Sequence, residues 1–201
     1  LANKHKLLVI EDCAEALGTK FKNMQVGINS DAAVFSFFGN KLITTGEGGM
    51  ICFKEKEMYK KAKKLAAHGM DPDKKYWHNF VGFNFRLTNL QAALGLGQLE
   101  RIDSFIKSKQ KIASIYRIYL EKNPLINFQE EIYNSESSYW LVTIFLDHSI
   151  KHLRDKLLVY LQNKGIECRP CFYPLNEMPP YTKYKKLSLT NSIELAYSGI
   201  S

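Results

Sequence analysis

Residues 36–49 read Ser-Phe-Phe-Gly-Asn-Lys-Leu-Ile-Thr-Thr-Gly-Glu-Gly-Gly, a loop sequence in which one lysine, Lys41, lies among apolar residues and glycines. The glycines permit tight backbone turns. A lysine removed from water tends to lose its proton, and the neutral amine is a nucleophile that forms Schiff bases with carbonyl compounds. Most lysines are solvated surface charges, so it is this setting that makes Lys41 a candidate catalytic residue.

Short apolar runs on both sides of this loop predict a sheet. Residues 7–10 read as a buried strand, residues 32–37 as a second strand and residues 50–53 as a third. Glu11 and Asp12 follow the first run directly, at the carboxyl end of a predicted parallel strand, where α/β proteins place ligand contacts. Three strands are too few for a sheet covered on both faces. We therefore expect an α/β domain whose N-terminal part is missing from this chain.

Helical patterns follow the third predicted strand. Residues 55–68 are strong helix formers, and Gly69 is placed to end that helix. Thr88 can cap a helix that reaches residue 99. Residues 102–120 carry apolar side chains on one face and predict a long helix.

A separate unit is predicted beyond that helix. Residues 127–138 read as a polar connecting loop, followed by a strand at 139–146, an amphipathic helix at 149–163 and a further strand at 166–169. We therefore divide the chain into the C-terminal part of a large α/β domain (1–100), a linking helix (101–124) and a truncated small α+β domain (125–201).

Composition limits the classes of function. The net charge of +8 suggests nucleic acid as one partner, but the lysines are spread over predicted helices and a solvated helix face explains most of them. No apolar run approaches the roughly 18 residues that span a bilayer, and no secretory leader is visible. The pattern Cys168-Arg169-Pro170-Cys171 lacks the second ligand pair that zinc needs. We expect a cytoplasmic protein with reduced thiols, no metal, no nucleic acid and no membrane partner.

Asp12 and Lys41 together are compatible with pyridoxal phosphate chemistry. Such enzymes need a lysine that holds the cofactor as an imine and moves protons, and a carboxylate that keeps the pyridine nitrogen protonated. A strand-end aspartate that precedes a loop lysine meets this requirement, although Asp12 would equally serve as a capping or loop aspartate. Spacing alone leaves both interpretations of Asp12 open.

Four segments carry a resemblance to a known family. Residues 9–18 (Val-Ile-Glu-Asp-Cys-Ala-Glu-Ala-Leu-Gly) resemble its aspartate strand, and residues 36–50 resemble its lysine loop. Residues 82–99, with Asn-Phe-Arg-Leu-Thr at 84–88, and residues 165–175 resemble two later landmarks. Their order over nearly the whole chain is similar to that in the nucleotide-sugar aminotransferase family of fold-type I pyridoxal phosphate enzymes. The residues around Lys41 are most similar to those of the GDP-perosamine synthases of that family.

The resemblance implies a role for five residues. Lys41 would bind pyridoxal 5'-phosphate covalently and shuttle protons, and Asp12 would pair with the pyridine nitrogen. Glu15, where many relatives have glutamine, would sit near the ring hydroxyl, and Ser36 would hydrogen-bond the phosphate. Asn84 would reach the phosphate from the partner subunit of a homodimer, so the active site would be a property of the dimer.

The resemblance also implies a reaction. The amino group of L-glutamate would be moved to a 4-keto-6-deoxy nucleotide sugar, as in perosamine formation for surface polysaccharide such as lipopolysaccharide O-antigen. Arg86, Arg169 and Tyr173 are candidates for contact with the sugar nucleotide, although Arg86 would equally serve in a salt bridge that supports its loop.

Three alternatives stay open at this stage. In the first, the sugar nucleotide carries UDP or dTDP instead of GDP. In the second, the chain is an inactive or interaction-only fragment. In the third, the positive net charge binds nucleic acid. Dehydratases of the same fold replace the lysine with histidine, so Lys41 argues against them. The resemblance implies a longer N-terminal part, in which a turn binds the phosphate and an aromatic residue stacks on the ring. This chain carries neither, so we expect weak or absent cofactor binding by the chain alone.

Overall fold

The computed structural model describes residues 1–184 and 189–201, and the chain divides into two compact units. The first unit comprises Leu1–Lys109 and Ile132–Trp140, and the second comprises Gln110–Glu131 and Leu141–Ser201. This division groups Ile132–Trp140 with the first unit, whereas the sequence-based boundaries place those residues in the small domain. The predicted boundaries stay a prediction.

In the described part of the first unit, a short helix precedes five strands, and three helices and one further strand follow. In chain order they are α1 (Ala2–His5), β1 (Ile10–Asp12), β2 (Lys20–Phe21), β3 (Met24–Gln25), β4 (Ala32–Ser36), β5 (Gly49–Phe53), α2 (Lys56–Ala66), α3 (Asn89–Leu99), the first part of α4 (Ile102–Leu120), and β7 (Ser135–Glu136).

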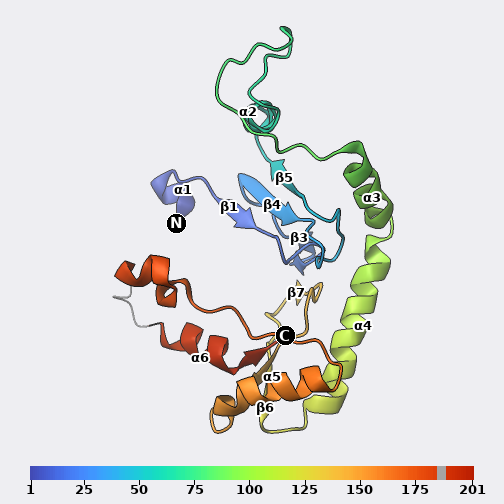
Figure 1. Cartoon of the computed structure of the whole chain (residues 1–201), viewed down its shortest axis with the longest axis vertical. Helices are drawn as coiled ribbons and strands as arrows, with labels where there is room; N and C mark the ends of the chain where they lie inside the picture. Colours follow the sequence, from blue (N-terminus) through green and yellow to red (C-terminus); the bar gives the residue numbers. More distant parts are fainter. Residues whose placement is uncertain (185–188) are drawn as a thin grey trace. The chain divides into compact units, whose positions relative to one another are not determined.

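The main sheet of this unit has the strand order β1-β4-β5 (Figure 1). β4 pairs in parallel with β1, where Asp12 lies opposite Val34, and antiparallel with β5, where Ser36 lies opposite Gly49. The strands predicted at 32–37 and 50–53 are confirmed by β4 and β5. The sheet is therefore mixed, and Asp12 and Ser36 end their parallel strands at the same edge.

The strand predicted at residues 7–10 differs from the observed β1. The strand begins only at Ile10, and the expectation that this run is buried is wrong, because Leu8 is 70% exposed and Ile10 67% exposed. The physical reason is that β1 has β4 on one side only: among the described residues no strand pairs with its other edge.

Buried residues of the first unit gather around β4 and the loop that follows it. Ala32 and Ala33 lie within β4, Cys13 follows β1, and Phe37 and Ile43 lie in the loop. Ile43, the largest fully buried side chain, is 2% exposed. The root of the lysine loop is thus part of the core rather than a solvated surface loop.

A second small sheet draws a distant segment into the same unit. β2 pairs antiparallel with both β3 and β7, with Phe21 opposite Ser135. The expectation that residues 127–138 form only a connecting loop is therefore wrong, because β7 belongs to this sheet. This pairing holds the residues up to Trp140 in the first unit.

The predicted helices of the first unit are confirmed with small shifts. Gly69, at φ 65°, donates its N–H to the Lys64 carbonyl at 2.9 Å beyond the end of α2. α3 begins after a capping box in which Gln91 N–H donates to the Thr88 hydroxyl at 3.2 Å and Thr88 N–H donates to the Gln91 side chain at 2.9 Å. α4 has the predicted bounds.

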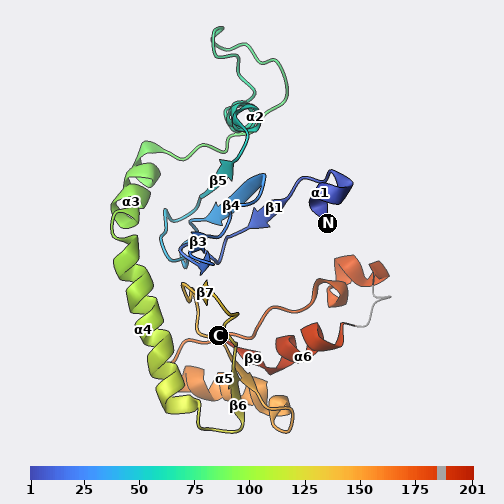
Figure 2. The same cartoon turned by 180° about the vertical axis from the view of Figure 1, so that it is seen from behind.

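The second unit packs helices against a small antiparallel sheet. Its remaining elements are β6 (Ile126–Phe128), β8 (Ile144–Leu146), η1 (Lys151–Leu153), α5 (Arg154–Asn163), η2 (Leu175–Glu177), η3 (Pro179–Tyr184), α6 (Thr190–Ser198) and β9 (Gly199–Ile200). The strand order is β6-β8-β9, and Figure 2 shows β9 following directly on α6. Leu146, Leu158 and Ile200 form its core.

Two strand predictions in the second unit need correction. Only Ile144–Leu146 of the run at 139–146 forms a strand, and residues 166–169 form none. Arg169 and Ser201 instead exchange two backbone hydrogen bonds of 2.9 Å, which is an isolated pairing and not a regular β-strand.

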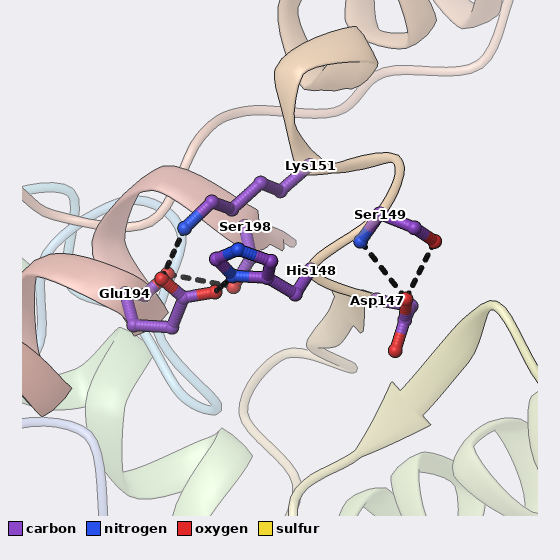
Figure 3. A network of polar contacts seen from close by, with 6 residues as sticks. All are labelled: Asp147, His148, Ser149, Lys151, Glu194 and Ser198. Atoms are coloured by element: carbon purple, nitrogen blue, oxygen red, sulfur yellow. Dashed lines mark hydrogen bonds and ion pairs between the residues drawn. The ribbon is translucent and has the colours of Figure 1, made fainter.

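A polar network joins α6 to the turn after β8 (Figure 3). The Glu194 carboxylate receives the Lys151 ammonium on one oxygen and lies 3.2 Å from His148 Nδ1 on the other. The Lys151 and His148 hydrogen bonds lower the pKa of Glu194 from its ordinary value. Ser149 donates two hydrogen bonds to Asp147 Oδ1, which lowers the pKa of Asp147. These contacts stabilise the folded form of the second unit.

Candidate active site

The lysine loop, residues 36–49, is closed on itself by backbone hydrogen bonds. Phe37 N–H donates to the Gly48 carbonyl, and the N–H of Thr45 donates to the Phe37 carbonyl, each at 2.9 Å. The Thr44 hydroxyl donates to the same Phe37 carbonyl at 3.0 Å. The loop is therefore an ordered structure that presents Lys41 from its tip.

Helix α3 clamps the loop from outside. Thr44 N–H donates to the Gln98 side-chain oxygen at 3.0 Å, and the Gln98 amide donates to the Thr44 carbonyl at 2.6 Å. About two turns earlier in α3, the Gln91 amide donates to the Glu47 carbonyl at 3.1 Å. An amide side chain is suited to this task because it offers a donor and an acceptor at once. Both glutamines lie in the segment 82–99 that carries the family resemblance, and in the structure they clamp the lysine loop.

The Lys41 amine lies between a carboxylate and an aromatic ring. Its Nζ is 3.2 Å from Glu15 Oε1 and 3.7 Å from the centroid of the Trp140 ring, and the Lys41 side chain is 12% exposed. A cation at this distance over an indole face is attracted by the ring quadrupole, with about 0.5–2 kcal/mol depending on desolvation. Lys41 is thus held on two sides, unlike a solvated surface lysine.

Asp12 and Ser36 lie at the carboxyl ends of β1 and β4. Asp12 Oδ1 accepts the N–H of Ala14 at 3.0 Å, which is the local turn contact of a loop aspartate. Ser36 Oγ accepts the N–H of Phe38 at 3.3 Å, so its hydroxyl proton stays available to an acceptor. The sheet edge therefore carries a carboxylate and a hydroxyl in the unit that holds Lys41.

Cys13 directly follows Asp12, and its thiol is poorly suited to act as a nucleophile. Burial raises the pKa of its thiol, and the carboxylates of Glu11 and Asp12 raise it further. The thiolate is the reactive form, and it is disfavoured here. All four cysteines are free, and the described residues contain no group of three or more metal-ligating side chains.

Asn84 and Arg86 lie on an exposed loop after α2. The backbone around Asn84 runs beside the end of that helix, with Phe83 N–H donating to Leu65 and Phe85 N–H to Ala66. The Phe83 and Phe85 rings stack with centroids 5.0 Å apart. No hydrogen bond or ion pair in the described part of the chain joins Asn84 or Arg86 to Lys41. Their predicted roles, which for Asn84 need a second subunit, stay predictions.

Arg169 and Tyr173 belong to the second unit. Tyr173 packs against Tyr197, with ring centroids 5.4 Å apart, and its hydroxyl accepts from Arg154 at 3.4 Å. Arg154 is 3% exposed and donates to the Ala196 carbonyl at 2.6 Å. Tyr173 therefore has a structural role within its unit, and its contact with substrate, like that of Arg169, stays a prediction.

Trp140 is the site residue that sequence reasoning missed. The pattern at 139–146 predicted a strand, and one tryptophan at its start carries no catalytic signal. The pairing of β7 with β2 and the hydrogen bonds between Ser138 and Thr19 bring this segment to the lysine loop.

Known proteins that are similar to this chain are aminotransferases of one family. The model of the DegT/DnrJ/EryC1/StrS aminotransferase family matches residues 1–201. GDP-perosamine synthase of Vibrio cholerae is 45% identical over the whole chain, and that of Escherichia coli O157:H7 is 42% identical. The chain covers 55% and 54% of these two proteins, so it spans about half the length of the curated relatives it matches.

Solved structures show the same fold. PseC of Helicobacter pylori, an aminotransferase involved in the biosynthesis of pseudoaminic acid, has a TM-score of 0.93 at 28% identity, and the match covers 100% of this chain and 55% of PseC. The PLP form of the putative sugar aminotransferase Spr1654 from Streptococcus pneumoniae has a TM-score of 0.85 at 26% identity, covering 96% of this chain and 52% of Spr1654. The chain therefore belongs to the DegT/DnrJ/EryC1/StrS aminotransferase family.

Proposed function

We propose that this chain carries the lysine-bearing part of a pyridoxal phosphate-dependent aminotransferase that moves the amino group of L-glutamate to a 4-keto-6-deoxy nucleotide sugar in the cytoplasm. The GDP-perosamine synthases among its relatives support GDP as the nucleotide. The observation that carries the proposal is the Lys41 amine, which is largely covered and held at the tip of a clamped loop.

The residues present fit pyridoxal phosphate. Lys41 supplies the amine for covalent attachment to the aldehyde of the cofactor. Asp12 keeps one carboxylate oxygen, Oδ2, without a hydrogen bond to any described residue, so it can receive the N–H of a protonated pyridine. Ser36 has a hydroxyl proton for a phosphate oxygen, and Glu15 lies beside the amine, near the expected position of the ring hydroxyl. We propose that Asn84 reaches the phosphate from the second subunit of a homodimer.

The chemistry divides between the cofactor and the chain. When bound, the cofactor supplies an electron sink for the pair left on a carbon that loses its proton. Asp12 would keep the ring nitrogen protonated by pairing with its N–H. Lys41 would act as the base that removes the proton from the α-carbon of L-glutamate. It would then return that proton to the cofactor carbon on the other side of the shared nitrogen. Glu15 would hold the Lys41 ammonium close to these two carbons. Arg86, Arg169 and Tyr173 are proposed to contact the sugar nucleotide.

Reductive trapping tests this proposal on the 201-residue chain. The chain is incubated with pyridoxal phosphate and reduced with borohydride, which fixes even a transient carbon–nitrogen bond, and peptide mass spectrometry then locates the label. We expect Lys41 to be labelled ahead of Lys60, a solvated lysine paired with Glu57 on α2. Lys41→Met removes that label and leaves the label at Lys60. Equal labelling of Lys41 and Lys60 would refute the assignment of Lys41.

An activity assay then tests the substrate. The same chain receives L-glutamate and a keto-sugar nucleotide with GDP, UDP or dTDP, and formation of amino sugar is followed by mass spectrometry. Preference for the GDP sugar is expected. Labelling of Lys41 without amination of any of the three would favour the alternative of an inactive fragment.

A further inference from the structure

We propose that Trp140 is a positioning residue that holds the Lys41 amine for reaction, an inference that rests on the proposed function. The indole makes two contacts with the lysine loop. Its ring face lies 3.7 Å from Lys41 Nζ, and its Nε1–H donates to the Asn40 carbonyl at 2.7 Å. A single side chain therefore fixes both the backbone just before Lys41 and the amine at its end.

The backbone that carries the indole is itself fixed. Ser138, 1% exposed, exchanges hydrogen bonds with Thr19, at 3.2 Å through its N–H and 3.0 Å through its hydroxyl. Tyr139 has φ 48°, in the left-handed region that a bulky residue rarely adopts. Such conformations persist where the surrounding structure over-determines them, and they gather at functional sites. Lys109 also donates to the Trp140 carbonyl at 3.1 Å.

These contacts give the indole a role that Glu15 lacks. The Glu15 carboxylate attracts the Lys41 ammonium and can also accept its proton, whereas the indole face attracts the cation and offers no proton acceptor. Trp140 thus restricts where the Lys41 ammonium lies and, unlike Glu15, cannot take its proton. Restricting the amine beforehand removes orientational freedom that the reaction would otherwise have to remove.

The chain contains a matched control for this contact. Its other tryptophan, Trp77, has the Lys74 ammonium 3.6 Å from its ring centroid, nearly the same geometry. Trp77 is 53% exposed and lies on the loop after α2, outside the lysine loop. A general effect of removing an aromatic face next to a lysine would appear at both sites, whereas of the two tryptophans Trp140 lies against Lys41 and Trp77 against Lys74.

The first measurement is NMR of the 201-residue chain with labelled lysine, where protons above an aromatic face resonate upfield. We expect the ε-CH2 signal of Lys41, assigned through Lys41→Arg, to be shifted upfield. Trp140→Leu abolishes the shift, Trp140→Phe retains it, and Trp77→Leu leaves it unchanged. An unshifted Lys41 signal in the unmodified chain, or one insensitive to Trp140→Leu, would overturn the proposal.

The second measurement is the rate of borohydride trapping of pyridoxal phosphate at Lys41. Trp140→Leu should lower that rate roughly tenfold or more, because a displaced amine reacts poorly, while Lys60 serves as the internal reference. An unchanged rate contradicts positioning by Trp140. Absence of trapping in the unmodified chain instead contradicts the proposed function, and the NMR comparison still judges the Trp140 contact.

A third measurement covers the case in which Trp140→Leu does not fold. The indole N–H signal of Trp140 is then observed in the Trp77→Phe variant, in which Trp140 is the one remaining tryptophan. Adding Lys41→Met should move that signal, and adding Lys60→Met should not. A Trp140 signal whose position is unchanged by Lys41→Met would also refute the contact between Lys41 and the indole.

Discussion

Ile43→Ala is the sharpest test of how the lysine loop is held. Ile43 lies two residues after Lys41 and is 2% exposed, so its side chain anchors the loop in the core. The substitution removes three carbons, each worth about 0.8 kcal/mol of burial, or about 2.4 kcal/mol together. The cavity left behind adds to this loss, which gives an expected destabilisation of about 3 kcal/mol.

Urea denaturation followed by circular dichroism measures this loss of stability. With a denaturant slope of about 2 kcal/mol per molar, a loss of 3 kcal/mol lowers the midpoint by about 1.5 M. The control is Ile28→Ala, which removes the same atoms from a side chain that is 64% exposed. Its cost should stay below about 1 kcal/mol, since little of that side chain leaves water on folding.

The same pair of variants tests the link from packing to chemistry. If Ile43 holds the loop, Ile43→Ala should also slow trapping of pyridoxal phosphate at Lys41 under conditions where the variant is still folded. Ile28→Ala should not slow it. Equal midpoint shifts in the two variants would refute the argument that burial of Ile43 anchors the loop.

Two further predictions concern stability. Folding lowers the pKa of Glu194, mainly through its hydrogen bond with Lys151 and to a smaller extent through that with His148. The contribution of the Glu194 carboxylate to the free energy of unfolding is therefore complete above the ordinary glutamate pKa of about 4.3, and it is lost as pH falls through the folded-state pKa. Glu194→Gln should therefore lower the melting temperature at neutral pH and match the unmodified chain in acid below that range; a difference independent of pH contradicts the ion pair. Thr88→Ala removes the cap that receives Gln91 N–H and should cost about 1 kcal/mol in urea denaturation, whereas Thr88→Ser should cost clearly less; equal costs would argue against the cap.

The lysine loop illustrates what could be predicted before the fold was known. The strands around it, the glycines within it and the helix that starts after Thr88 are all local features, and β4, β5 and α3 confirm them. Apolar runs and caps act over a few residues, so they are legible in the chain itself. The likeness of four segments to one family likewise depends only on residue order.

The edge strand illustrates what could not be predicted in this way. Four apolar residues at 7–10 read as a buried strand, yet Leu8 and Ile10 are mostly exposed. Burial depends on which other segments pack against a strand, and a local pattern carries no information about them. For the same reason, residues 166–169 were predicted as a strand but pair with the chain end through isolated contacts.

The amino-acid sequence by itself determined that Lys41 lies in a glycine-rich loop between two strands, because those preferences are local. Only the tertiary structure decided what surrounds its amine. Glu15 arrives from the turn after β1, and Trp140 arrives from a segment 100 residues beyond Asn40, through the pairing of β7 with β2. The physical reason is that contacts between distant segments depend on strand pairing and burial of the whole unit, which no short stretch of sequence specifies.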